Sequence, residues 1–118
     1  MNSMATVLIV DDDDGVRRLA DLILRQSGHE TICACNGLEG LMVYSSYHRY
    51  FDLVLTDVDM PQMNGIELAD RIRARDPLRK ILLMSGNSRT EAGQHYPFLA
   101  KPFLPDQLVA AIDSILKQ

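Results

Sequence analysis

Short apolar runs that stop at a polar residue, separated by longer amphipathic stretches, constrain the fold of this chain more than any other feature. The runs cover residues 7–10, 30–35, 53–56, 81–84 and 98–100. The first, third and fourth are apolar on both faces and too short for helices, as expected of buried strands. Helices are predicted over about 16–27, 37–47, 65–75 and 105–117 from the spacing of apolar residues.

Strands that alternate with helices through short links predict a parallel sheet with helices on both faces. The three most apolar runs belong at the centre of the sheet, and the second and fifth belong at its edges. We therefore expect an α/β fold, a flavodoxin-like doubly wound five-stranded parallel sheet in the order 2-1-3-4-5. A tail of residues 1–5 precedes this domain, which is expected to cover residues 6–118.

Two helices carry local expectations that the structure can test. The helix over 37–47 is expected to turn Leu38, Leu41 and Met42 inward. The last helix starts at Leu104, whose side chain cannot accept a capping hydrogen bond, so Asp106 must help or the helix start is frayed.

Composition excludes several classes of partner and location. Twelve basic and 16 acidic residues give a net charge of −4, which argues against a broad cationic surface for nucleic acid or anionic lipid. Apolar runs stay far below the roughly 18 residues of a membrane span, and the first residues lack a secretory pattern. Cys33 and Cys35 are interpreted as small packed residues in a reducing compartment, so the expected location is cytoplasmic.

The polar residues that end the strands meet at one edge of the predicted sheet. They are Asp11 and Asp12, Asp57, Ser85 and Lys101. Because ligands of such sheets bind outside the carboxyl ends of the strands, at the point where the strand order reverses, the crevice lies between the first and third strands.

Three carboxylates in one crevice repel one another unless their pKa values rise or a cation joins them. Oxygen ligands suit Mg²⁺, and this edge lacks the cysteine and histidine that zinc prefers. A metal, an ammonium and a hydroxyl together can hold a phosphoryl group, and one carboxylate could accept it as an aspartyl phosphate. Asp57 is the best candidate, whereas Asp13 and Asp14 are interpreted as helix-capping residues.

Four motifs in this order resemble the receiver domain of two-component response regulators. They are residues 8–12 (LIVDD), 53–61 (LVLTDVDMP), 84–86 (MSG) and 100–103 (AKPF). The resemblance covers nearly the whole chain. It implies that Asp57 accepts a phosphoryl group from a phosphohistidine on a histidine kinase or a histidine phosphotransfer protein, and that the downstream target is another protein.

The resemblance also implies a role for each neighbouring residue. Asp12 and Asp57 would bind Mg²⁺ (or Mn²⁺) through their side chains, Asp11 mainly through water, and Asp59 through its backbone carbonyl. The remaining implied residues are Ser85, Gly86 and Lys101 for phosphate binding, Ser85 and Phe98 for switching, and Asp59 and Asn87 for tuning the phosphoryl lifetime. A cis bond is expected between Lys101 and Pro102, and Phe98 has simple core packing as its alternative.

One stretch departs from the family pattern. The spacing from Ser85 to Lys101 is about six residues shorter than usual, so the helix between the fourth and fifth strands is expected to be short or irregular. In this shortening and in the MSG motif, the chain resembles receivers attached to hybrid sensor histidine kinases.

Two other functions remain open on the sequence. Asp57 and Asp59 match the nucleophile and acid of haloacid-dehalogenase-like phosphatases, although that motif normally ends the first strand and the chain lacks room for a cap. A constitutive protein-binding module with a vestigial acidic site is the third hypothesis. We expect a phosphoacceptor switch with at most self-dephosphorylation, rather than an enzyme.

Overall fold

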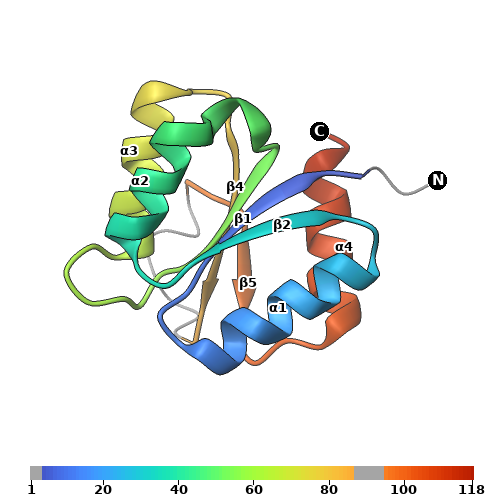
Figure 1. The fold of residues 1–118 in the computed structure, drawn as a ribbon. Helices are drawn as coiled ribbons and strands as arrows, with labels where there is room; N and C mark the ends of the chain where they lie inside the picture. Colours follow the sequence, from blue (N-terminus) through green and yellow to red (C-terminus); the bar gives the residue numbers. More distant parts are fainter. Residues whose placement is uncertain (1–3, 87–94) are drawn as a thin grey trace.

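The computed structural model describes residues 4–86 and 95–118, which form one parallel sheet flanked by helices (Figure 1). The strands are β1 (Thr6–Val10), β2 (Glu30–Ala34), β3 (Leu53–Asp57), β4 (Lys80–Ser85) and β5 (Phe98–Ala100). The helices are α1 (Asp14–Gln26), α2 (Gly37–Tyr47), α3 (Gly65–Arg75) and α4 (Pro105–Leu116), with a 3-10 turn η1 (His48–Tyr50). The order β2-β1-β3-β4-β5 confirms the predicted topology.

Two apolar layers hold the helices on the sheet. Leu8 and Val10 of β1 face α2 and α3, whereas Val7 and Ile9 face α1 and α4. All four side chains are fully buried, which is why the β1 sequence is continuously apolar rather than alternating. Figure 1 shows the resulting three layers, with a helix pair on each side of the sheet.

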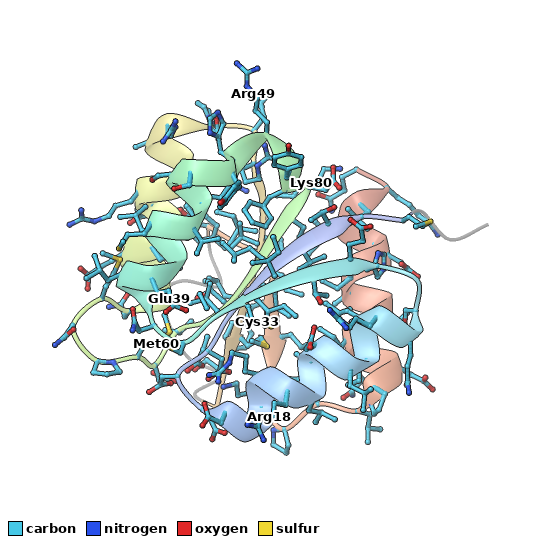
Figure 2. The ribbon with its side chains drawn as sticks, viewed as in Figure 1. Arg18, Cys33, Glu39, Arg49, Met60 and Lys80 are labelled. Atoms are coloured by element: carbon cyan, nitrogen blue, oxygen red, sulfur yellow. The ribbon has the colours of Figure 1, made fainter. Side chains whose placement is uncertain are left out.

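The carboxyl ends and the amino ends of the parallel strands lie at opposite edges of the sheet. Figure 2 shows Met60 and Arg18 near the end where β1 and β3 finish, and Lys80 and Arg49 at the opposite end. Lys80 begins β4, so that opposite end carries the amino ends of the strands. These two ends have different chemical characters, as described below.

Helix α2 turns a different face to the sheet from the one expected: the prediction is wrong for Leu38 and Met42, whereas Leu41 packs against the core as expected. The side chains of Leu38 and Met42 are 56% and 63% exposed. Gly40 and Tyr44 are buried instead, and a Cβ at Gly40 would lie 2.9 Å from Val10 Cγ2. The helix therefore approaches β1 too closely for a larger residue on that face.

Local structure at three places refines the sequence predictions. Asp13 caps α1 as expected, because its carboxylate accepts from the backbone N–H groups of the first turn. At the start of α4 the Leu104 N–H donates to Gln107 Oε1 at 2.7 Å, so Gln107 rather than Asp106 supplies the side-chain partner. Cys33 and Cys35 are free and exposed, not packed.

Some sequence predictions concern residues that the structure does not describe, or stay predictions. The shortened helix falls on residues 87–94, outside the described residues, and so does Asn87. The domain boundary at residue 6 stays a prediction. Among the described residues, no helix is long and apolar enough to cross a membrane.

Candidate functional site

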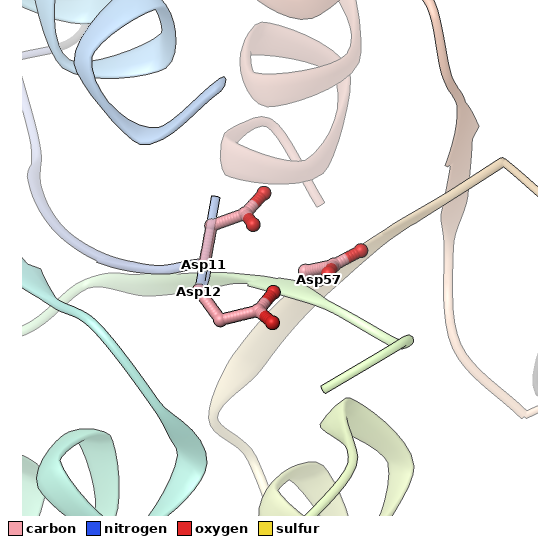
Figure 3. A group of neighbouring side chains, drawn as sticks. All are labelled: Asp11, Asp12 and Asp57. Carbon is pink, nitrogen blue, oxygen red and sulfur yellow. The ribbon is translucent and has the colours of Figure 1, made fainter. Parts of the chain in front are cut away.

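Three carboxylates gather at the carboxyl ends of the central strands. Asp11 and Asp12 follow β1, and Asp57 is the last residue of β3. Each offers one oxygen atom to a cluster in which these atoms lie within 4.8 Å of one another (Figure 3). The two strands are paired in the sheet, so their register fixes this approach. We call this cluster, with Lys101, the acidic site.

Lys101, which directly follows the edge strand β5, contacts two of the carboxylates. Its Nζ donates to Asp11 Oδ2 and to Asp57 Oδ1, both at 2.9 Å. Asp11 and Asp57 are buried, whereas Asp12 is exposed to solvent. One ammonium among three carboxylates leaves the acidic site with an excess of negative charge on an accessible side.

Burial and charge shift the pKa values in the acidic site. Burial raises the pKa of Asp57, and the nearby Asp11 carboxylate raises it further, while the Lys101 ammonium offsets part of the increase. Burial also opposes the charged form of Lys101, but its hydrogen bonds to Asp11 and Asp57 raise the pKa of Lys101 above its ordinary value. Lys101 therefore stays charged while the carboxylates compete for it.

The other predicted residues lie around this site at different depths. Ser85 is the last residue of β4. Its side chain is buried, and its hydroxyl donates to Asp59 Oδ2 at 2.8 Å. Gly86 is exposed and lines a groove with Lys101. Phe98 is partly buried against the core formed with α2 and α3. The peptide bond between Lys101 and Pro102 is cis, as expected.

Two residues that shape the site were missed in the sequence. The Arg17 guanidinium donates to the Asp11 carbonyl at 2.8 Å and pairs with the Asp14 carboxylate, so it braces the loop after β1. The spacing of Asp14 and Arg17 on one helix face could have signalled this pair. Gly65 begins α3 against the backbone of Asp57, and a Cβ there would lie 2.0 Å from the Asp57 carbonyl oxygen.

The donor set of the acidic site fits a hard divalent cation. Three carboxylate oxygens lie close enough to bind one ion, and neither sulfur nor imidazole belongs to the cluster. Mg²⁺ usually binds proteins through one or two carboxylates and keeps several waters, for which the exposed Asp12 side leaves room. Lys101 donates to one oxygen of Asp11 and one of Asp57, and the second Asp11 oxygen accepts from the Asp13 N–H at 2.9 Å, so Asp11 is hydrogen-bonded through both oxygens.

The sequence comparison decides the family. Residues 7–113 match the family described as the response regulator receiver domain. The chain belongs to this receiver domain family. As a receiver domain it is a phosphoacceptor switch of two-component phosphorelay signalling, and the phosphatase and constitutive-module alternatives are not favoured.

The curated relatives that this chain matches are longer proteins. It is 31% identical to the regulatory protein AtoC of Escherichia coli over 99% of this chain and 26% of AtoC. It is 40% identical to the sensor kinase/phosphatase LuxN of Vibrio campbellii over 74% of this chain and 10% of LuxN. The chain thus spans about a quarter or less of these relatives.

Solved structures of receiver domains share the fold. The chemotaxis protein CheY4 of Vibrio cholerae matches with a TM-score of 0.88 and 29% identity, over 96% of this chain and 99% of CheY4. The receiver domain of the hybrid histidine kinase CckA matches with a TM-score of 0.83 and 29% identity, over 94% of this chain and 98% of that chain.

Proposed function

We propose that Asp57 is the phosphoacceptor of this receiver domain. The observation that carries the proposal is the position of the Lys101 ammonium, 2.9 Å from both Asp57 and Asp11, beside an accessible cluster of carboxylates. An Asp57 oxygen would attack phosphorus, the phosphorus–nitrogen bond of a phosphohistidine would break, and the imidazole would leave with the electron pair. The product is an aspartyl phosphate.

The cation in this proposal is Mg²⁺ or Mn²⁺. Asp12 and Asp57 would hold it by their side chains, Asp11 mainly through water, and Asp59 by its backbone carbonyl. When bound, the ion would neutralise phosphoryl oxygens during transfer. The excess negative charge of the acidic site supports this assignment, because a divalent cation removes the repulsion that Lys101 only partly offsets.

After transfer, Lys101, Ser85 and Gly86 would bind the phosphoryl oxygens. Ser85 would move toward the new group, and Phe98 would turn inward as the space beside it changes. Phosphorylation adds charge and acceptor oxygens, so it shifts the population between two packed states. Asp59 and Asn87 would tune the lifetime of the phosphoryl group, and turnover would be limited to self-dephosphorylation.

The donor in this proposal is a histidine kinase or a histidine phosphotransfer protein. An apolar groove adjoins the acidic site through Lys101, and its lining is Val16, Leu19, Gly86, Lys101, Pro102 and Phe103. A donor protein seated there would bring its phosphohistidine to Asp57. Cys33 and Cys35 are free and exposed, which fits the reducing cytoplasm as the place of this reaction.

Uptake of phosphate from acetyl phosphate tests the phosphoacceptor directly. We expect Mg²⁺-dependent incorporation of one phosphoryl group, and tight binding of beryllofluoride, by the wild type. Asp57→Asn abolishes both while keeping the shape of the side chain. Phosphorylation that continues in Asp57→Asn would contradict the proposal, and sustained phosphate release from small phosphoesters would favour a phosphatase.

The groove is tested with a protein donor and a small donor side by side. Leu19 is 44% exposed, so Leu19→Glu should leave the fold intact. We expect slower transfer from a phosphohistidine protein and unchanged uptake from acetyl phosphate. Equal rates of protein-donor transfer in the variant and the wild type would exclude this groove as the docking surface.

A further inference from the structure

The hydrogen bond between Ser85 and Asp59 links the last residue of β4 to the loop after β3. Ser85 ends β4 and is buried, and its hydroxyl donates to Asp59 Oδ2 at 2.8 Å. Asp59 lies two residues after β3, and its side chain is exposed. The bond therefore joins the carboxyl end of β4 to the loop that follows its neighbour β3.

This hydrogen bond uses the same hydroxyl that the proposed switch needs. A hydroxyl has one proton to donate, so Ser85 cannot donate it to Asp59 and to a phosphoryl oxygen at the same time. A carboxylate is a strong acceptor, and hydrogen bonds to ionised groups are stronger than neutral ones. The unphosphorylated state is therefore stabilised by a contact that must break during switching.

We propose that Asp59 holds the Ser85 hydroxyl in the unphosphorylated state through this hydrogen bond, which we call the latch. The inference rests on the proposed function, and it assigns to the Asp59 side chain a role separate from the backbone carbonyl assigned to the metal. Asp59 acts through Ser85 and is a positioning residue. Breaking this hydrogen bond costs free energy, and that cost opposes phosphorylation. A ligand that needs the Ser85 hydroxyl therefore binds more weakly than it would without Asp59.

Two substitutions at one position separate the hydrogen bond from the charge. Asp59→Asn and Asp59→Ala both remove the negative charge, but the asparagine amide oxygen can still accept from Ser85. Any effect of charge on Mg²⁺ or on an anionic ligand is common to both variants. The difference between them therefore measures the latch.

The first experiment measures beryllofluoride affinity at fixed Mg²⁺ in the wild type and both variants. We expect Asp59→Ala to bind about three- to tenfold more tightly than Asp59→Asn, the range expected for one hydrogen bond. In a Ser85→Ala background this ratio should fall to about one, because the latch has lost its donor. Equal affinities of the two Asp59 variants, or a ratio that persists without Ser85, would overturn the latch.

The second experiment uses the unligated protein and does not depend on phosphorylation. Side-chain couplings measured by NMR report the Ser85 χ1 rotamer. We expect the Ser85 χ1 populations of the wild type to be kept in Asp59→Asn and to change in Asp59→Ala; identical populations in all three proteins would overturn the latch. If beryllofluoride fails to bind the wild type while the rotamer result holds, the proposed function fails and the hydrogen bond stands.

Discussion

The two ends of the sheet differ in how well their charges are balanced. At the carboxyl ends, two of three clustered carboxylates share one lysine, and burial holds the pKa of Asp57 above its usual range. At the amino ends, Tyr44 donates to the Asp76 carboxylate and accepts from Arg79 Nε at 2.9 Å. We call these three residues the Tyr44 cluster.

This difference separates residues that support the fold from residues to which we assign the proposed chemistry. The Tyr44 cluster balances one carboxylate with one guanidinium around a fully buried ring, which joins α2 to the segment after α3. The acidic site leaves negative charge uncompensated, which costs stability but attracts a cation. Substitutions at the two ends should therefore have opposite consequences.

The largest expected effect is at Asp57. Asp57→Asn should abolish phosphoryl uptake and, without Mg²⁺, raise the free energy of unfolding by about 1 kcal/mol, because one buried carboxylate is removed. Phosphorylation assays check the loss of phosphoryl uptake, and urea unfolding in EDTA checks the free energy of unfolding. A variant that is both inactive and less stable would break the comparison, because Asp57 would then also support the fold.

The Tyr44 cluster should show the reverse pattern. Tyr44→Ala removes a fully buried ring and should cost about 3–5 kcal/mol of stability. Tyr44→Phe keeps the ring but removes the hydroxyl bridge, and should cost about 1–2 kcal/mol. Beryllofluoride affinity of the folded fraction should stay at the wild-type value in Tyr44→Phe, as measured by titration well below the unfolding midpoint. A large loss of affinity would mean that the two ends are coupled.

Two glycines sharpen the comparison at the level of the backbone. Gly65→Ala places a Cβ against the Asp57 carbonyl and should cost about 1–3 kcal/mol and also weaken beryllofluoride binding. Gly28→Ala meets no atom within 4 Å but strains a residue at φ +93°, so it should cost about 1 kcal/mol and leave binding unchanged. Equal affinities for beryllofluoride in the two variants would contradict the role of Gly65 in positioning Asp57.

The smallest expected effect is the pH dependence of the two carboxylates. Hydrogen bonding from Tyr44 lowers the pKa of Asp76, so its contribution to stability is present above its unfolded pKa and is lost as pH falls through the folded value. Burial raises the pKa of Asp57, so its contribution has the opposite sign and is lost as pH rises through the folded value. NMR titration of the carboxyl carbons without metal should place Asp57 above Asp76; the reverse order would contradict the comparison.

Much of the site could be predicted because each strand that leads into the site ends where its sequence turns polar. The apolar runs before Asp11, Asp57 and Lys101 fix the strands, and parallel topology then brings these ends to one edge. The buried face of α2 was predicted only in part, because apolar spacing does not show that Gly40 allows a closer approach than Leu38 or Met42.

Side-chain contacts between residues that are distant in the sequence could not be predicted in the same way. The bond from Ser85 to Asp59 depends on side-chain direction after two different strands, which periodicity does not encode. The same holds for the Tyr44 cluster, because Tyr44 and Asp76 are 32 positions apart. Such pairs become visible only when the helices and strands are packed.

The central claim is that Asp57 itself becomes phosphorylated in a cation-dependent reaction. The most direct measurement is chemical trapping: incubation with acetyl phosphate and Mg²⁺, reduction of the acyl phosphate with borohydride, and peptide mass spectrometry. The account predicts reduction at Asp57 alone, and none when EDTA replaces Mg²⁺. Trapping at Asp11 or Asp12 in place of Asp57, or an unmodified chain with Mg²⁺ present, would contradict it.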